Sequence, residues 1–304
     1  MDNKAEVREF LTTRRAKITP QQAGVPNAGR RRVPGLRRSE VASLAGMSVE
    51  YYSKLERGAL GGVSSGVLDA ISRALQLDDA ERRHLFNLAL AADGTAAAMR
   101  PRRRVTARWV PKPSLQWALD AIVTGPAIVG NNRSDLLATN ALGRALYADV
   151  LADTTRQPNL ARFAFLDAAA RRFYPNWEHT ADITVSNLRT AAGLDPHDQA
   201  LQELVGELST LSGEFRTRWG AHNVRIHAGG LKQYHHHEVG ELELAYESMD
   251  LRSEPGLSLT IFIAEPGSAS SERLRLLASL AAATAASEAS MAAAPGGAAV
   301  PGRL

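Results

Sequence analysis

Residues 38–57 combine residue types whose spacing suits the reading of DNA. A helix-turn-helix needs a small residue where its two helices cross, and a turn residue that tolerates unusual backbone dihedrals. Ala42 and Gly46 meet these needs four positions apart, and Tyr52 and Leu55 are spaced to face inward from the second helix. The pattern predicts a helix-turn-helix whose second helix enters the major groove of DNA. The alternative is a helical bundle that merely contains a glycine turn.

The outward face of that second helix carries side chains that can read base edges. Ser48 is placed to cap the helix at Tyr51. Lys54 can reach guanine acceptors, Glu50 can accept from a cytosine amine, and Val49 can contact a thymine methyl. Arginines before and after the helix suit phosphates. The candidate DNA-contacting residues are therefore Arg30, Arg31, Arg32, Arg37, Arg38, Ser48, Val49, Glu50, Tyr51, Ser53, Lys54 and Arg57.

Charge and composition narrow the class of protein. Residues 1–110 contain 20 basic and 11 acidic side chains, a balance of +9, whereas the rest has a balance of −5 within the total of +4. A polyanionic partner is thus expected for the front of the chain only. The absence of cysteine excludes disulfides, cysteine-ligated zinc and thiol catalysis, and it fits a cytoplasmic protein. No run of ~18 apolar residues predicts a membrane span, and no apolar stretch near Met1 predicts a secretory signal.

The 304 residues suggest about two domains. We expect a helical domain over residues 1–92, a linker rich in proline and arginine over 93–113, and a domain of mixed helix and strand over 114–268. Residues 269–304 predict an alanine-rich helix followed by a disordered tail.

Periodicity places individual elements within these domains. Asp78 and Glu81 predict a capping box at the start of a helix. One later helix is expected to carry Phe173 and Trp177 on the same face, and the pair Gly229-Gly230 predicts a hairpin turn. Helices are also expected at 3–17, 115–122 and 198–211, and strands at 127–130, 136–139, 224–228, 231–235, 241–248 and 257–264.

A ligand cavity needs apolar walls and a few convergent polar groups. The aromatic candidates for its walls are Trp117, Phe163, Phe165, Phe173, Tyr174, Trp177 and Trp219, and the polar candidates are Asn140, His222 and His236. The alternative is that the aromatic side chains simply form the core.

Other kinds of site find less support. On a strand, His235 and His237 would share one face and could bind a metal ion if a third ligand came from elsewhere. The chain contains no Gly-rich phosphate loop, no Gly-x-Ser-x-Gly elbow and no His-Glu-x-x-His pair. We therefore expect no enzymatic activity, no catalytic residue, and no metal or other cofactor apart from a bound amphiphile.

The run from Arg30 through Gly46 to Gly58 closely resembles the XRE-type helix-turn-helix of MmyB-like transcription regulators, which are bacterial and especially frequent in actinobacteria. One departure follows the recognition helix, where Arg57 and Ala59 replace the usual Gln and Arg. The later segments that are similar to this family's ligand-binding domain are 126–129, 135–141, 177–178, 212–219, 239–244 and 265–268.

The resemblance implies a multidomain protein, in which an all-α helix-turn-helix domain precedes an α/β PAS-like ligand-binding domain. A member of the family is known to hold a fatty acid there, which makes a fatty acid a candidate ligand. Three functional hypotheses follow. The chain is a transcription regulator that senses a small amphiphile and binds double-stranded DNA as a homodimer, or its C-terminal half is a dimerisation or protein-docking module without a ligand. The third is a regulator that senses metal or pH through His235–His237.

Overall fold

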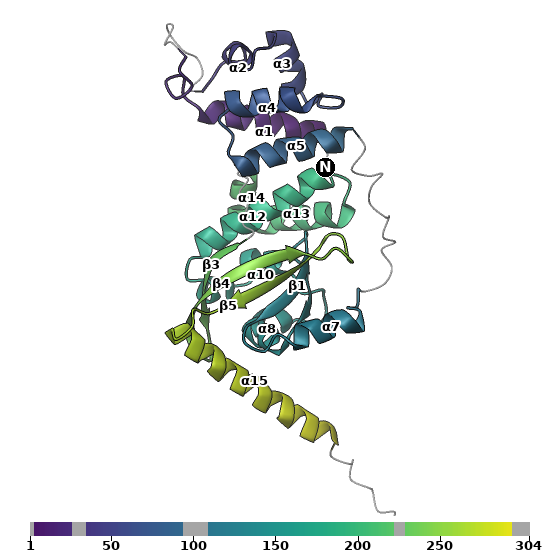
Figure 1. Cartoon of the computed structure of the whole chain (residues 1–304), viewed down its shortest axis with the longest axis vertical. Coiled ribbons are helices and arrows are strands. Elements are labelled where there is room, and N and C mark those ends of the chain that lie inside the picture. The colour runs from purple at the N-terminus through teal and green to yellow at the C-terminus, as the bar shows by residue number, and fades with distance from the viewer. Residues whose placement is uncertain (1–2, 26–34, 94–108, 222–228, 294–304) are drawn as a thin grey trace, which may run out of the picture.

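The N-terminal part of the chain consists of short helices around one apolar core (Figure 1). The computed structural model describes residues 3–25, 35–93, 109–221 and 229–293. Phe10, Leu55 and Leu85 come from three different helices and are almost completely buried together. The helices are α1 (Asn3–Lys17), α2 (Arg38–Leu44), α3 (Val49–Glu56), α4 (Ser65–Ala74) and α5 (Asp79–Ala92).

Two local predictions in this part are confirmed. The first helix has the expected bounds, 3–17. The backbone N–H of Glu81 donates to the Asp78 carboxylate at 2.8 Å, and the N–H of Asp78 donates to the Glu81 carboxylate at 3.1 Å. This reciprocal pair satisfies two backbone donors that the start of α5 would otherwise leave unpaired.

The C-terminal part is built on a five-stranded antiparallel sheet with the strand order β2-β1-β5-β4-β3. In chain order its strands are β1 (Ala127–Asn131), β2 (Leu136–Thr139), β3 (Gly229–His236), β4 (Gly240–Asp250) and β5 (Leu257–Ile263). Leu242 and Leu244 are buried and alternate with exposed Glu241 and Glu243, as expected for a half-buried strand. A helical domain followed by an α/β domain is the expected fold class.

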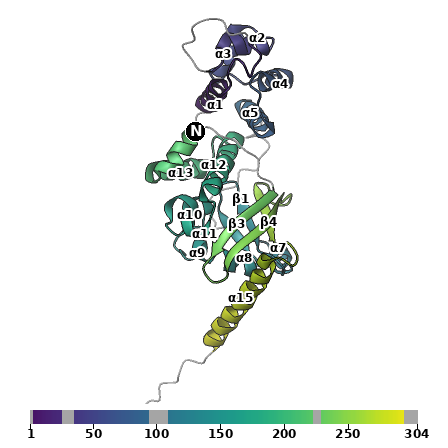
Figure 2. The ribbon, with the colours of Figure 1, turned by 90° about the vertical axis from the view of Figure 1, so that its left-hand side faces the viewer.

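Helices surround this sheet and connect its strands. They are α7 (Pro113–Asp120), α8 (Ala141–Leu146), α9 (Ala148–Leu151), α10 (Leu160–Leu166), α11 (Ala170–Phe173), α12 (Trp177–Leu194), α13 (Gln199–Leu211), α14 (Gly213–Gly220) and α15 (Ala269–Ala293). Figures 1 and 2 both place α12 and α13 between the sheet and the N-terminal helices, whereas α15 projects from the opposite end. No helix in the described ranges has the length and apolar composition to cross a membrane.

Two expected features differ in the structure. Phe173 and Trp177 do not share a helix, because Pro175 disfavours helical backbone at Tyr174 and separates α11 from α12. Gly229-Gly230 is not a turn, because both glycines pair with Glu247 and Tyr246 inside the β3–β4 ladder. The hairpin turns instead at residues 237–239. The strand expected at 224–228 lies outside the described residues.

Candidate DNA interface and ligand cavity

The helix-turn-helix is assembled as its residue types predict. Gly46 adopts a φ of +65° in the turn between α2 and α3, a backbone region that favours glycine. The Ser48 hydroxyl accepts a hydrogen bond from the backbone N–H of Tyr51 at 3.1 Å and so caps α3. Ala42 and Tyr52 are fully buried where the helices pack. Tyr52 therefore belongs to the core rather than to the surface that faces DNA.

The opposite face of α3 is open. Val49, Glu50, Tyr51 and Lys54 are exposed on it, and Ser53 is half-buried beside them. In Figure 1, α2 and α3 lie at the end of the molecule away from the sheet, so the C-terminal domain does not cover this face. Side chains at the start of a recognition helix are the ones that usually reach base edges.

The flanking arginines differ in their placement. Arg37 and Arg57 are exposed at the ends of α2 and α3. Arg38 is half-exposed and forms an ion pair with the buried carboxylate of Glu56. The cluster Arg30–Arg32 lies outside the described residues, so its proposed phosphate contacts stay a prediction.

We expect Lys54→Ala and Arg38→Ala to weaken DNA binding in different ways. A base contact by Lys54 contributes about 1–3 kcal/mol at one base pair, so its loss weakens one duplex sequence preferentially. Loss of a phosphate contact by Arg38 weakens every duplex and lowers the salt slope by about one. Fluorescence anisotropy at several salt concentrations measures both effects. If both variants lose the same affinity for specific and for random duplexes, the assignment of these contacts is contradicted. Because Arg38 also pairs with Glu56, melting curves check that Arg38→Ala has not simply destabilised the domain.

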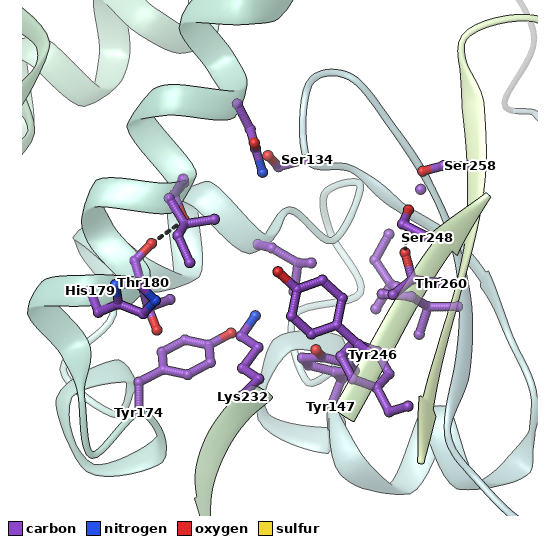
Figure 3. Close-up of a pocket in the computed structure, with 18 of the residues that line it drawn as sticks. Ser134, Tyr147, Tyr174, His179, Thr180, Lys232, Tyr246, Ser248, Ser258 and Thr260 are labelled. Carbon is purple, nitrogen blue, oxygen red and sulfur yellow. Dashed lines mark hydrogen bonds between the residues drawn. The ribbon is translucent and has the colours of Figure 1, made fainter. Parts of the chain in front are cut away.

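A cavity of about 450 Å³ lies between the inner face of the sheet and α12 (Figure 3). This volume is within the range of small-molecule sites. Helix α12 contributes Thr180, Ile183, Thr184 and Asn187, which recur at the spacing of one helix face. The sheet side is lined by Ile128, Lys232, Tyr246, Ser248, Thr260 and Phe262. The walls thus combine apolar side chains, hydroxyls and one lysine.

The ammonium of Lys232 is the unusual group in this cavity. Its Nζ lies 5.1 Å from the ring centre of Tyr174 and 5.5 Å from that of Tyr234, and Figure 3 shows the side chain between Tyr174 and Tyr246. Within the described ranges no carboxylate forms an ion pair with it. Burial lowers the pKa of Lys232 from 10.5 to about 8, because the charged form loses hydration.

The other charged groups that line the cavity already have partners. The Asp135 carboxylate accepts from the side-chain amides of Asn131 and Asn159, both at 2.8 Å, and lies 3.5 Å from the Arg133 guanidinium. The Glu243 carboxylate accepts from the Gln233 amide at 3.0 Å. Lys232 is the one lysine that lines the cavity, and neither of these carboxylates forms an ion pair with it.

Tyr147 and Tyr174 line the cavity, and Tyr234 lies beside Lys232. Tyr147 and Tyr234 are fully buried and their hydroxyl oxygens are 2.8 Å apart. Burial raises the pKa of Tyr147, Tyr174 and Tyr234 above the ordinary value, so all three hydroxyls stay neutral at neutral pH.

Family models match both parts of the chain. A helix-turn-helix domain model matches residues 10–85, and the model of the MmyB-like transcription regulator ligand binding domain matches residues 111–277, more than half of the chain. The chain belongs to the MmyB-like transcription regulators. No curated protein matches the sequence. With its helix-turn-helix, this MmyB-like chain is a DNA-binding transcription regulator.

In this regulator, most residues expected to bind ligand lie outside the cavity. Tyr174, one of the aromatic candidates, does line it. His222 is outside the described residues. The candidates that the structure describes elsewhere are Trp117, Asn140, Phe163, Phe165, Phe173, Trp177, Trp219 and His236.

The two polar candidates that the structure describes, Asn140 and His236, form hydrogen bonds within the fold. The side-chain oxygen of Asn140 accepts from the backbone N–H groups of Ala127 and Gly143, while its amide donates to Ile122 and Gly125 carbonyls. His236 is buried, with its Nε2 3.1 Å from the Ala145 carbonyl oxygen. Asn140 thus caps α8 and closes the loop before β1.

The aromatic candidates outside the cavity are mostly core residues. Phe163 and Phe173 pack edge to face with ring centres 5.6 Å apart, and the Trp177 indole N–H donates to the Ala164 carbonyl at 2.8 Å. Trp219 stacks on Phe215. Trp117 is 70% exposed on α7, so it lines neither core nor cavity.

The histidine run does not converge on a site. His236 points into the core, whereas His235 and His237 are exposed. Across the described residues no three His, Asp or Glu side chains come together in a way that could hold a metal ion.

Sequence reasoning missed Lys232, Tyr147, Tyr246 and the polar face of α12. One signal was present for Lys232. Alternate residues of a strand lie on the same face, so Lys232 lies on the face of β3 that carries the buried Tyr234 and His236. A lysine in that phase is either paired or placed in a cavity.

Proposed function

We propose that a small amphiphile with an acidic head group occupies the cavity and controls DNA binding by this regulator. The observation that carries the proposal is Lys232, a partly buried cation that lines the cavity and forms no ion pair with a carboxylate of the described residues. A desolvated charge without a counter-ion is costly, so a ligand anion beside it stabilises the complex. Apolar side chains such as Ile128, Ile183 and Phe262 suit the ligand's tail. A fatty acid has this chemistry.

Two copies of the chain are proposed to act together on DNA. Helix-turn-helix proteins that read operators commonly present two recognition helices to two half-sites. A homodimer would place two copies of α3 on one face of a duplex, one helical turn apart.

Mass spectrometry tests both statements. Small molecules are released by denaturing the purified protein, and the native mass is measured beside them with and without added dodecanoate. For the ligand, we expect either one acidic amphiphile released per chain or a mass increase equal to one dodecanoate per chain. For the oligomer, we expect the native mass of a dimer. An empty protein that gains no mass would overturn the ligand proposal and favour a C-terminal docking module. A monomeric mass with and without duplex would overturn the dimer.

A further inference from the structure

We propose that ligand occupancy reaches the DNA-binding domain through α12, whose Arg189 fixes that helix to Glu6 of α1. The inference rests on the proposed function, because it concerns how the cavity regulates DNA binding. Helix α12 is the element that the cavity and the N-terminal domain share: one face lines the cavity, and the other packs on α5 and α1.

The two faces of α12 are built from different side chains. Thr180, Ile183, Thr184 and Asn187 line the cavity. Arg189 follows Asn187 by two positions, which turns it to the other side of the helix. It is fully buried between the domains, although arginine is almost never buried without a partner.

Three interactions hold the Arg189 side chain. Its guanidinium forms an ion pair with the Glu6 carboxylate, which is 5% exposed, and donates to the Trp219 carbonyl. The guanidinium carbon also lies 4.2 Å from the centre of the Trp219 ring. One side chain therefore connects α1, α12 and the end of α14.

A steric contact near Arg189 makes the interface sensitive to the position of α12. A Cβ placed on Gly193 would lie 2.7 Å from Cε1 of the fully buried His84 on α5. Only glycine allows this approach of the two helices. The His84 Nε2 is in turn 3.8 Å from the Glu6 carboxylate, so the charge contact and the close contact form one cluster.

This geometry gives the ligand a direct route to the DNA-binding domain. A ligand that fills the cavity presses on α12 or draws it toward the sheet, and a close-packed helix transmits that displacement to its opposite face. The displacement changes DNA binding only if the ligand binds the two arrangements unequally. Arg189 and Gly193 are positioning residues in this scheme, because neither touches ligand or DNA.

The test measures how far dodecanoate changes the affinity for a duplex selected in vitro with the full chain. Coupling between two sites typically changes affinity about 5- to 150-fold. We expect Glu6→Gln and Gly193→Ala each to bring the wild-type factor close to one, while dodecanoate affinity stays within about threefold. Glu6→Gln removes the charge that pairs with Arg189, whereas Gly193→Ala adds a methyl group that prevents the close approach of α12 to His84. The two variants therefore disturb the interface by different means.

Matched controls separate this effect from general damage. Gly206→Ala on α13 adds a methyl where nothing lies within 4 Å, and Arg162→Gln breaks the 2.8 Å pair with Glu207 inside the C-terminal domain. Both are expected to keep the wild-type coupling factor. Wild-type coupling in both Glu6→Gln and Gly193→Ala would overturn the proposal.

A second measurement does not depend on the ligand. Coupling is reciprocal, so the selected duplex alone is expected to change amide hydrogen exchange in residues 177–194 of the wild-type chain but not of Glu6→Gln. If dodecanoate and other acidic amphiphiles fail to bind the wild-type protein, the proposed function fails while this measurement still decides the role of α12. Unchanged exchange in the wild-type helix would overturn that role.

Discussion

Lys232→Met is expected to weaken dodecanoate binding by about 10- to 100-fold while leaving dodecanol binding within about threefold, because a hydrogen bond to a charged group contributes about 1.5–3 kcal/mol. Methionine keeps the length of the side chain and suits an apolar wall, so the cavity keeps its shape. The variant also removes a partly buried cation without a counter-ion, so we expect the protein to melt at the same temperature as the wild type or higher. Calorimetric titration with dodecanoate and with dodecanol measures the affinity of each ligand for the wild type and the variant.

The pH dependence provides an independent check of the same lysine. Burial lowers the pKa of Lys232 to about 8, whereas a bound carboxylate favours the charged form. Dodecanoate affinity should therefore fall as pH rises through about 8, and it should be flat in Lys232→Met. The stability of the protein changes with pH in the opposite direction. Between pH values of about 8 and 10.5, Lys232 holds more protons in the unfolded chain than in the folded one. Its contribution to the free energy of unfolding therefore rises as pH rises through this range.

Lys232→Arg serves as the control for charge alone. It keeps the cation but places a planar group of different shape in the cavity, so partial retention of the preference for acid over alcohol is expected. Equal losses for dodecanoate and dodecanol in Lys232→Met would contradict a charge contact, as would an affinity that does not change with pH.

The helix-turn-helix could be predicted because its signals are local. Gly46 needs a left-handed backbone, Ser48 needs a neighbouring N–H, and Ala42 needs to be small, and each of these requirements depends on residues only a few positions away. The bounds of α1 and β2 followed from periodicity in the same way. Local rules also explain the interruption at Pro175, which the pattern of aromatic residues concealed.

The cavity could not be predicted in this way, because its walls come from segments far apart in the chain. Trp177 and Trp219 have the size and amphipathic character of pocket residues, yet Arg171 and Arg189 lie 3.9 Å and 4.2 Å from their ring centres and fix them elsewhere. Asn140 has the polarity of a ligand contact, but four backbone groups saturate it. Only the packing of α12 over the sheet shows that the threonines of this helix face a cavity.

Glu56→Ala is expected to destabilise the DNA-binding domain by about 3–5 kcal/mol, because it breaks the pair between the buried Glu56 carboxylate and the Arg15 guanidinium, whose side chain is only 14% exposed. The Glu56 carboxylate is 1% exposed at the end of α3; it accepts from Arg15 Nε of α1 at 2.7 Å and pairs with Arg38 of α2. An acidic side chain at the C-terminal end of a helix is unfavourable toward the helix dipole. The two arginines therefore explain why an acidic residue is found at this end of α3. Through Glu56 they connect the recognition helix α3 to α1 and α2.

The loss would be a large share of the stability of such a domain, which is about 5–15 kcal/mol. We expect the melting temperature of the helical domain to fall by roughly 10–30 °C, and DNA affinity at 37 °C to fall with the folded fraction. Circular dichroism against temperature measures the first and anisotropy the second. Glu56→Gln keeps the shape and one hydrogen-bond acceptor, so a smaller fall is expected.

Asp69→Ala is the matched control for this prediction. Asp69 also pairs with an arginine of the same domain, at 2.7 Å from Arg82, but the two side chains are 32% and 51% exposed. An exposed pair contributes about 0–1 kcal/mol, so this variant should melt within about 5 °C of the wild type. A Glu56→Ala protein that melts as high as Asp69→Ala would show that water or a shifted arginine compensates the lost carboxylate. In that case α3 is held by the contacts of Tyr52 and Leu55 rather than by charge.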